Sequence, residues 1–270
     1  MSHSGGITGR GRGELAAVTA SGKRFVTLAD VSSALDIDPD AAAKRLSRWA
    51  KEGWVRRVRR GLYIGVPVEA SNPAAWSEDA VVVGTVIWAP CYFTGWTAAS
   101  HWALTEQVFR TTVLKTTQRV RSSHVRLLDH DYLLTHTVDN ALSFGLTSEW
   151  HSEHRVRFAD PARTVVDVLD EPRLAGGIRH AADITATFLE EYAPELLVDY
   201  GDTLGNRAVF KRLGYILEAL DIDAPQLVTA CLERVSQGIS PLDPDGPDGG
   251  RRIMRWGLRV NATITPQEPS

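Results

Sequence analysis

Apolar side chains recur at intervals of three and four over 28–35, which is the period of one helical face and predicts a helix there. Thr27 has the chemistry of an N-cap, and Asp30 stands at the third position of the first turn, a pair typical of a capping box. A similar pattern predicts a helix over 14–20. Residues 23–26, between the two, are expected to be extended.

A third helix is predicted over 39–52, with two faces of opposite character. Asp38 is its N-cap candidate, and Pro39 occupies the first helical position, where proline is tolerated. The apolar face comprises Ala42, Leu46, Trp49 and Ala50. The opposite face comprises Lys44, Ser47, Arg48 and Lys51, with Arg45 at its shoulder. One face therefore belongs to a core, and the other is a cationic ridge.

Two short β-prone runs follow, on either side of an Arg-Arg-Gly turn, and predict a hairpin. The hairpin carries Arg56, Arg57, Arg59 and Arg60. Three helices followed by a basic hairpin form the order of a winged helix-turn-helix, here over 13–66. In such a domain the third helix lies in the major groove, and the hairpin contacts phosphates or the minor groove.

After 67–74, which is predicted to be a linker, strand-like and helical patterns are mixed. Strands are expected at 111–117, 125–128, 133–138, 155–158 and 255–264; helices at 97–104 (capped by Thr97), 160–169, 178–191, 194–204 and 206–220; and 81–88 fits either. The predicted fold is α+β: a mobile tail over 1–12, the winged helix-turn-helix, and a larger mixed domain over 75–265 with a flexible loop at 236–252.

Charge is divided unevenly along the chain. The whole sequence has a net charge of −3, but residues 1–65 carry a net +6 and the remaining 205 residues a net −9. Hydrophobic residues make up 43% and charged residues 23%, which is typical of soluble globular proteins. The longest apolar run, 80–90, is far shorter than the roughly 20 residues of a membrane-spanning helix, and residues 1–14 are not expected to act as a secretory signal. A cytoplasmic protein with a basic, polyanion-binding head is expected.

Basic residues on a helix face are often merely solvated, but here the cationic ridge coincides with the recognition-helix position. We therefore expect binding to double-stranded DNA. The candidates for contacts to base edges are Lys44, Arg45, Ser47, Arg48 and Lys51. The candidates for phosphate contacts are Arg56, Arg57, Arg59 and Arg60.

The larger domain offers little that indicates catalysis, so an enzyme, a cofactor and a metal site are not expected. It contains no phosphate-binding loop, dinucleotide fingerprint, serine-hydrolase elbow or zinc-protease motif. His151 and His154 lack a third ligand and are predicted to lie in a surface loop. Asp167 and Asp170 share a helix face and are expected to be solvated, and the two cysteines, Cys91 and Cys231, to be buried.

Three segments of the larger domain resemble the AbiEi antitoxins of type IV abortive-infection toxin–antitoxin systems. They are FTGWTAASHWALTEQ (93–107), DPARTVVDVLDEPRLAGG (160–177) and GNRAVFKRLGYILEALDI (205–222). Together with the predicted winged helix, the resemblance covers roughly 13–222. Its motif residues, for which helix capping and packing are the favoured roles, are Arg163, Thr164, Asp167, Arg212, Gly214, Tyr215 and Glu218. In this interpretation Gly214 admits a neighbouring helix, and Arg163 or Arg212 pairs with Asp167 or Glu218.

The resemblance implies a transcriptional repressor that binds inverted repeats in its own promoter. It also implies an antitoxin that counteracts a nucleotidyltransferase-like toxin, without requiring a stable complex with it. Two alternatives stay open: a winged-helix regulator whose larger domain senses a small ligand, and a nucleic-acid-cleaving enzyme, for which no acidic cluster with a lysine can be assembled from the sequence.

Overall fold

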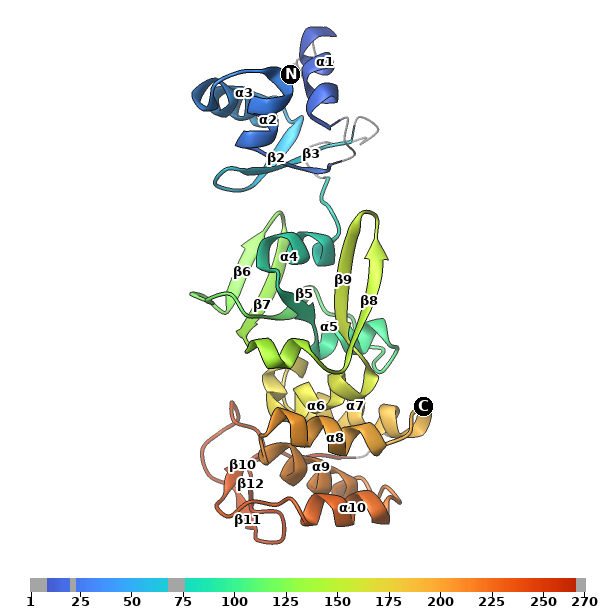
Figure 1. Cartoon of the computed structure of the whole chain (residues 1–270). Helices are drawn as coiled ribbons and strands as arrows, with labels where there is room; N and C mark the ends of the chain where they lie inside the picture. The colour runs from blue at the N-terminus through green and yellow to red at the C-terminus, as the bar shows by residue number, and fades with distance from the viewer. Residues whose placement is uncertain (1–8, 20–22, 68–75, 266–270) are drawn as a thin grey trace. The chain divides into compact units, whose positions relative to one another are not determined.

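The computed structural model describes residues 9–19, 23–67 and 76–265. The chain divides into an N-terminal unit, Met1–Glu78 with Leu127–Asp129, and a C-terminal unit, Asp79–Arg126 with His130–Ser270 (Figure 1). In the described part of the chain, every helix is too short or too polar to cross a membrane.

The N-terminal unit contains three helices and a three-stranded antiparallel sheet. Its elements are α1 (Gly9–Thr19), β1 (Phe25–Thr27), α2 (Leu28–Leu35), α3 (Pro39–Lys51), β2 (Val55–Arg59) and β3 (Leu62–Gly65). The strand order is β1-β3-β2, so the β2–β3 hairpin adds two strands to the short β1. Apolar residues of all three helices and the sheet form its core, with Val31, Leu46 and Trp49 fully buried.

Local capping chemistry sets the helix boundaries in this unit, as the sequence predicts. The Thr27 hydroxyl accepts a hydrogen bond from the Asp30 amide, and the Asp30 carboxylate accepts one from the Thr27 amide, which completes the capping box. Asp38 caps α3 through the Ala41 amide at 2.9 Å. One boundary differs: α1 begins at Gly9 rather than at residue 14, so part of the expected tail over 1–12 is helical.

The C-terminal unit is built on a six-stranded mixed sheet of order β6-β7-β5-β4-β9-β8. Its strands are β4 (Cys91–Phe93), β5 (Thr111–Thr116), β6 (His124–Leu127), β7 (His130–His136), β8 (Leu146–His151) and β9 (His154–Ala159). The pairs β5–β7 and β4–β9 are parallel, whereas β4–β5 and β8–β9 are antiparallel. The combination of this mixed sheet with helices confirms the predicted mixed α and β class.

Helices and a small second sheet complete the C-terminal unit (Figure 1). The helices are α4 (Ala80–Trp88), α5 (Gly95–His101), η1 (Asp139–Leu142), α6 (Pro161–Asp170), η2 (Pro172–Ala175), α7 (Ile178–Glu191), α8 (Glu195–Leu204), α9 (Ala208–Ala219) and α10 (Pro225–Leu232). The small sheet has the order β10-β12-β11, from β10 (Ser240–Pro241), β11 (Arg251–Ile253) and β12 (Leu258–Val260). The largest core cluster joins the helices to this sheet.

Several expectations for this unit need correction. The ambiguous run at 81–88 is helical, while β8 and α10 have no counterpart among the predicted elements. Thr97 does not cap α5, because its hydroxyl accepts a hydrogen bond from the Val113 amide instead. The segment 236–252, expected to be a flexible loop, is held by backbone pairing of β10 and by Asp243, whose carboxylate accepts a hydrogen bond from the Ile178 amide.

A buried ion cluster joins the large sheet to α6. Asp167 is fully buried, and its carboxylate accepts hydrogen bonds from Arg163 Nε at 3.0 Å and Thr94 Oγ1 at 2.7 Å. Lys115 Nζ of β5 lies 3.5 Å from Asp167 and 2.9 Å from Glu171. Although burial alone would raise the pKa of Asp167, the charges of Lys115 and Arg163 lower it. The expectation that Asp167 is solvated is therefore wrong, and the pairing with Arg163 is the one foreseen.

Asp170, one turn further along α6, is held differently. Its carboxylate accepts a hydrogen bond from Asn206 Nδ2 at 2.6 Å and lies 3.8 Å from Lys115 Nζ. Burial raises the pKa of Asp170, and the Lys115 charge does not offset this. Both cysteines are buried as predicted, and burial raises the pKa of each thiol to about 12.

Trp256, in the turn between β11 and β12, anchors this C-terminal hairpin on α9. This indole is fully buried, and its Nε1 donates a hydrogen bond to Glu218 Oε2 at 2.6 Å. A Cβ at Gly214 would lie 2.1 Å from two indole carbons, so this glycine admits an aromatic ring and not, as expected, a neighbouring helix. Arg212 pairs with neither Asp167 nor Glu218: its guanidinium donates hydrogen bonds to backbone carbonyls, among them that of Leu169 at 2.7 Å.

Replacing Gly214 with Ala is expected to destabilise the C-terminal unit by about 1–3 kcal/mol, because the new methyl group collides with Trp256. Gly13 in α1 is the matched control, since a Cβ there meets nothing within 4 Å. Gly13→Ala should be neutral or stabilising, as is usual for alanine in a helix. Thermal unfolding of both variants checks this; an unchanged or raised Tm for Gly214→Ala would contradict the packing described.

Replacing Asp167 with Asn should lower the free energy of unfolding of the C-terminal unit by about 3–5 kcal/mol at neutral pH, because Arg163 would stay buried without its counter-charge and Lys115 would lose one of its acidic partners. The pKa of Asp167 is lowered on folding, so its contribution is complete above the unfolded-state pKa of about 4 and is lost as pH falls through the folded-state pKa. The difference between wild type and variant should therefore shrink on acidification.

Urea unfolding at pH 7 and pH 3 measures this difference. Asp170→Asn is the control on the same helix: the pKa of Asp170 is raised, so a neutral side chain is better tolerated and the loss at pH 7 should be smaller. Equal losses for the two variants, or an Asp167→Asn effect that does not change with pH, would count against the charge cluster as the cause.

Candidate nucleic-acid interface

The outer face of α3 is cationic and free of core contacts. Ala42, Leu46 and Trp49 are buried against the N-terminal core, which fixes the rotation of the helix about its axis. The side chains predicted to lie opposite are all exposed: Lys44, Ser47, Arg48 and Lys51. The structure therefore brings these four predicted site residues together on one surface, which we call the α3 face.

Arg45 is held differently from the α3 face. It is half-buried, and its guanidinium forms an ion pair with Glu14 of α1 at 2.7 Å. Arg48 lies 3.7 Å from Glu52, a looser pair one turn apart on the helix surface. Such an exposed pair costs little to break, so Arg48 keeps its freedom to contact a ligand, whereas Arg45 is committed to joining two helices.

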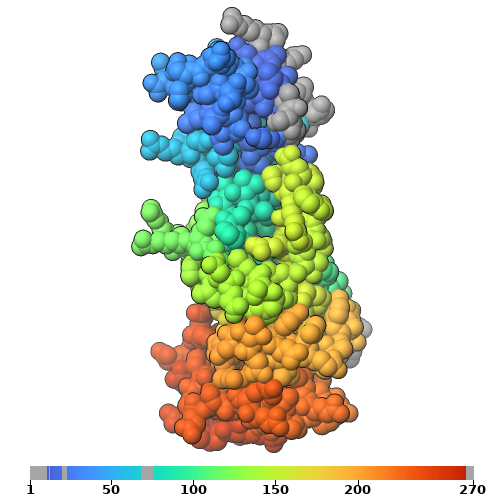
Figure 2. All heavy atoms as spheres, viewed as in Figure 1, coloured from blue at the N-terminus to red at the C-terminus, as the bar shows by residue number. Residues whose placement is uncertain are grey.

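Three of the four hairpin arginines are exposed. A bulge between Arg57 and Arg59 of β2 lets Val58 turn into the core while both arginines face solvent. Arg60 precedes Gly61, whose φ of +79° forms the tight turn at the tip. Figure 2 shows this tip projecting from the body of the N-terminal unit. A projecting cationic tip is accessible to an extended polyanion.

Arg56 is the exception on the hairpin. Its guanidinium donates a hydrogen bond to the Trp76 carbonyl and forms an ion pair with Asp129 at 2.7 Å, both within the N-terminal unit. The side chain is half-buried. Arg56 and Arg45 thus differ from the other predicted DNA-contacting residues, because each is held in an ion pair. The acidic partner is distant in sequence in both cases, so neither ion pair could be predicted from the spacing of residues along the chain.

His151 and His154 lie on either side of the turn of the β8–β9 hairpin. His151 and His154 end the two strands of the β8–β9 hairpin rather than lying in a loop. His151 Nδ1 lies 3.2 Å from Asp79 and His154 Nε2 3.4 Å from Glu153. In the described ranges, His, Cys, Asp and Glu nowhere form a group of three that could hold a metal ion.

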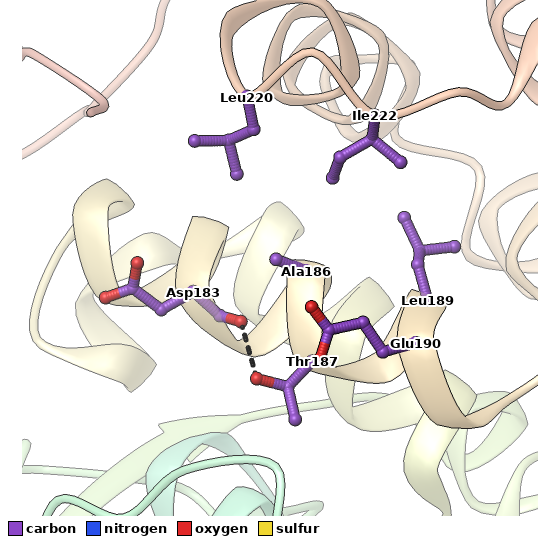
Figure 3. A pocket seen from close by; sticks show the side chains of 7 residues that line it. All are labelled: Asp183, Ala186, Thr187, Leu189, Glu190, Leu220 and Ile222. Atoms are coloured by element: carbon purple, nitrogen blue, oxygen red, sulfur yellow. Dashed lines mark hydrogen bonds between the residues drawn. The ribbon is translucent and has the colours of Figure 1, made fainter. Parts of the chain in front are cut away.

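A pocket of about 410 Å³ lies between α7 and the end of α9 (Figure 3). Its apolar lining comes from Leu189, Leu220 and Ile222, and its carboxylates from Asp183 and Glu190. Thr187 donates its hydroxyl hydrogen bond to the Asp183 carbonyl within the helix. The lining suits an apolar or cationic group rather than a phosphate.

Residues 14–64, which span most of α1 through β3, match the family described as transcriptional regulator, AbiEi antitoxin. Over these residues the N-terminal unit is similar to the transcriptional regulators of this family. The match confirms the resemblance to the AbiEi antitoxins over residues 14–64 of the N-terminal unit. The three segments that suggested the resemblance lie outside these residues.

The fold of the whole chain is similar to that of the RV2827C protein from Mycobacterium tuberculosis, known from a crystal structure. The two share 14% sequence identity with a TM-score of 0.66, over 92% of this chain and 90% of that one. This likeness concerns the fold alone. No curated protein matches the sequence.

The variants Arg57→Ala and Arg56→Ala should differ in their effect on DNA binding, because Arg57 is exposed whereas Arg56 is held in an ion pair. Loss of Arg57, which is exposed, should weaken binding to any DNA duplex and reduce the slope of log K against log salt by about one. Loss of Arg56 should leave the slope nearly unchanged, because Asp129 already balances its charge, and should instead destabilise the unit by about 1–3 kcal/mol. Titrations at several salt concentrations measure both; equal slope changes would remove the distinction.

Proposed function

We propose that this protein is a DNA-binding transcriptional repressor and antitoxin of a type IV toxin–antitoxin system. The observation that carries the proposal is the α3 face, together with the exposed hairpin arginines, on a unit that matches the AbiEi regulators. Helices α2 and α3 would serve as the helix-turn-helix, and the β2–β3 hairpin as the wing. The net charge of +6 over residues 1–65 would attract the duplex.

The two parts of this surface would have different tasks on DNA. With α3 in the major groove, Lys44, Ser47, Arg48 and Lys51 would face base edges, where an arginine can pair with guanine through two hydrogen bonds. The hairpin arginines would contact phosphates, which sets register and affinity but reads no sequence. Binding of two copies to inverted repeats in its own promoter would repress the operon.

The antitoxin role rests on the description of the family that residues 14–64 match, and we assign this role to the C-terminal unit as part of the proposal. Its partner would be a nucleotidyltransferase-like toxin encoded beside it, counteracted without an obligatory stable complex. Repression and neutralisation are both binding functions, so the protein is proposed to be a non-enzyme that acts in the cytoplasm. Growth rescue of cells that express the toxin tests this role, with an Arg59→Ala/Arg60→Ala variant separating neutralisation from repression.

A mobility-shift titration on its own upstream DNA, against random duplex at two salt concentrations, tests the repressor role. Selective, stepwise and salt-sensitive shifts are expected. Equal affinity for promoter and random duplex would overturn sequence-specific repression. The pocket at α7 keeps a ligand-sensing regulator as a second candidate; a rise in Tm with apolar or cationic metabolites would favour it.

Arg48→Ala should cost about 1–3 kcal/mol on the specific site and little on random DNA, because it removes a base contact. Arg59→Ala/Arg60→Ala should weaken both duplexes alike and flatten the salt dependence, because it removes phosphate contacts. The same titrations, repeated with each variant, measure the difference. Equal losses on both duplexes for Arg48→Ala would take it out of the base-reading role.

A further inference from the structure

A second cationic site lies in the C-terminal unit, remote in sequence from the α3 face. A pocket of about 440 Å³ is bounded by the loop after η1 and by the β8–β9 hairpin. Arg155 and Arg157 of β9 line it, together with Ser143 and Ser148. It therefore combines two guanidinium groups with two hydroxyls, which are groups that bind phosphate oxygens.

The hairpin presents these side chains on one face. Ser148 stands opposite Arg157 in the β8–β9 ladder, and Trp150 stands opposite Arg155. Alternate residues of a strand share a face, and the intervening Val156 is fully buried on the other face. Trp150 is 72% exposed, and β8 is the last strand of the sheet. The outer face of the hairpin thus carries an aromatic ring beside the arginine pair.

The two arginines have no counter-charge within the described residues. Neither guanidinium forms an ion pair there, although residues 66–270 carry a net charge of −9. The nearest acidic side chains along the hairpin are engaged elsewhere: Glu149 contacts His101 at 2.9 Å, and Glu153 contacts His154. Two unpaired arginines two positions apart in an acidic domain favour an anionic ligand.

The wall of the pocket is fixed before any ligand arrives. The guanidinium of Arg163 lies 3.8 Å from the centroid of the Phe144 ring, and the Tyr200 ring is 5.4 Å from it on another helix. Gly145 has a φ of +60°, and a Cβ there would come within 2.8 Å of Arg163. Because Arg163 is itself held by Asp167, the buried ion cluster sets the position of this loop.

We propose that the β8–β9 hairpin binds single-stranded nucleic acid. Arg155 and Arg157 would hold a phosphate in the pocket, and a base would stack on Trp150. Trp150 stands across the ladder from Arg155 and is not among the residues that line the pocket, so the site extends past the pocket that would hold one phosphate, as a strand requires. An exposed aromatic ring beside arginines is the combination that binds single strands with little sequence preference.

The test uses the full-length chain carrying Arg57→Ala, Arg59→Ala and Arg60→Ala, so that the proposed duplex-binding surface is weakened. A labelled twelve-nucleotide poly-uridine strand is titrated at low salt and followed by fluorescence anisotropy. Adding Arg155→Ala/Arg157→Ala should weaken binding at least tenfold and reduce the salt slope by about 0.7, which corresponds to one lost phosphate contact on a single strand.

Matched variants show whether the loss of binding is specific to this pocket or follows from the loss of any two positive charges. Arg119→Ala/Arg121→Ala removes two exposed arginines with the same spacing from the loop between β5 and β6, and should leave binding unchanged. Trp150→Ala should weaken binding, and Trp150→Phe should largely retain it, since the ring is kept. A Tm measurement on each variant shows that the unit is folded.

Several outcomes would overturn the proposal. They are equal losses from the two arginine pairs, no effect of Trp150→Ala, or binding of uridine monophosphate as tight as that of the strand. Failure of promoter binding is a separate result, because Arg155→Ala/Arg157→Ala in the otherwise unchanged chain should bind duplex promoter as the wild type does.

Discussion

The C-terminal unit depends on compensating one fully buried carboxylate, that of Asp167. An isolated charge in a protein interior is strongly unfavourable, so Lys115 from β5 and Arg163 from α6 must both approach it. The contact with Lys115 joins the sheet to the helical layer, and the contact with Arg163 lies within α6. Arg163 also stacks on Phe144. Because Asp167 holds Arg163 in place, it also orients the loop that lines the pocket of Arg155 and Arg157.

The N-terminal unit is organised by a different kind of constraint, local capping and periodicity. The Thr27 capping box, the Asp38 N-cap and the apolar face of α3 all involve residues close in sequence. For that reason its helices α2 and α3, its hairpin and the exposed cationic face could be predicted from the sequence alone. What could not be predicted is which arginines are engaged: the partners of Arg45 and Arg56 are distant along the chain.

The sequence was less informative for the C-terminal unit because its decisive contacts are long-range. Asp167 looks like a surface carboxylate in a helical pattern, since nothing near it in sequence indicates that Lys115 of a distant strand will cover it. The edge strand β8 lacks a clear alternation, because its outer face carries Ser148 and Trp150 while its inner face carries Glu149 and His151. Gly214 could be recognised as a site of close approach, but the approaching group, Trp256, follows it by 42 positions and lies in the turn between β11 and β12.

The position of Trp256 in the chain has a consequence for the order in which the protein forms during synthesis. The core of the N-terminal unit draws its buried residues from between Val18 and Tyr63, so it can assemble early on the ribosome. The large core cluster of the C-terminal unit begins at Ala99 but includes Trp256 and Leu258. That core stays open along α9 until the β11–β12 hairpin has emerged from the ribosome. The core of the N-terminal unit can therefore be complete while the C-terminal unit still exposes apolar surface that its last strands will cover.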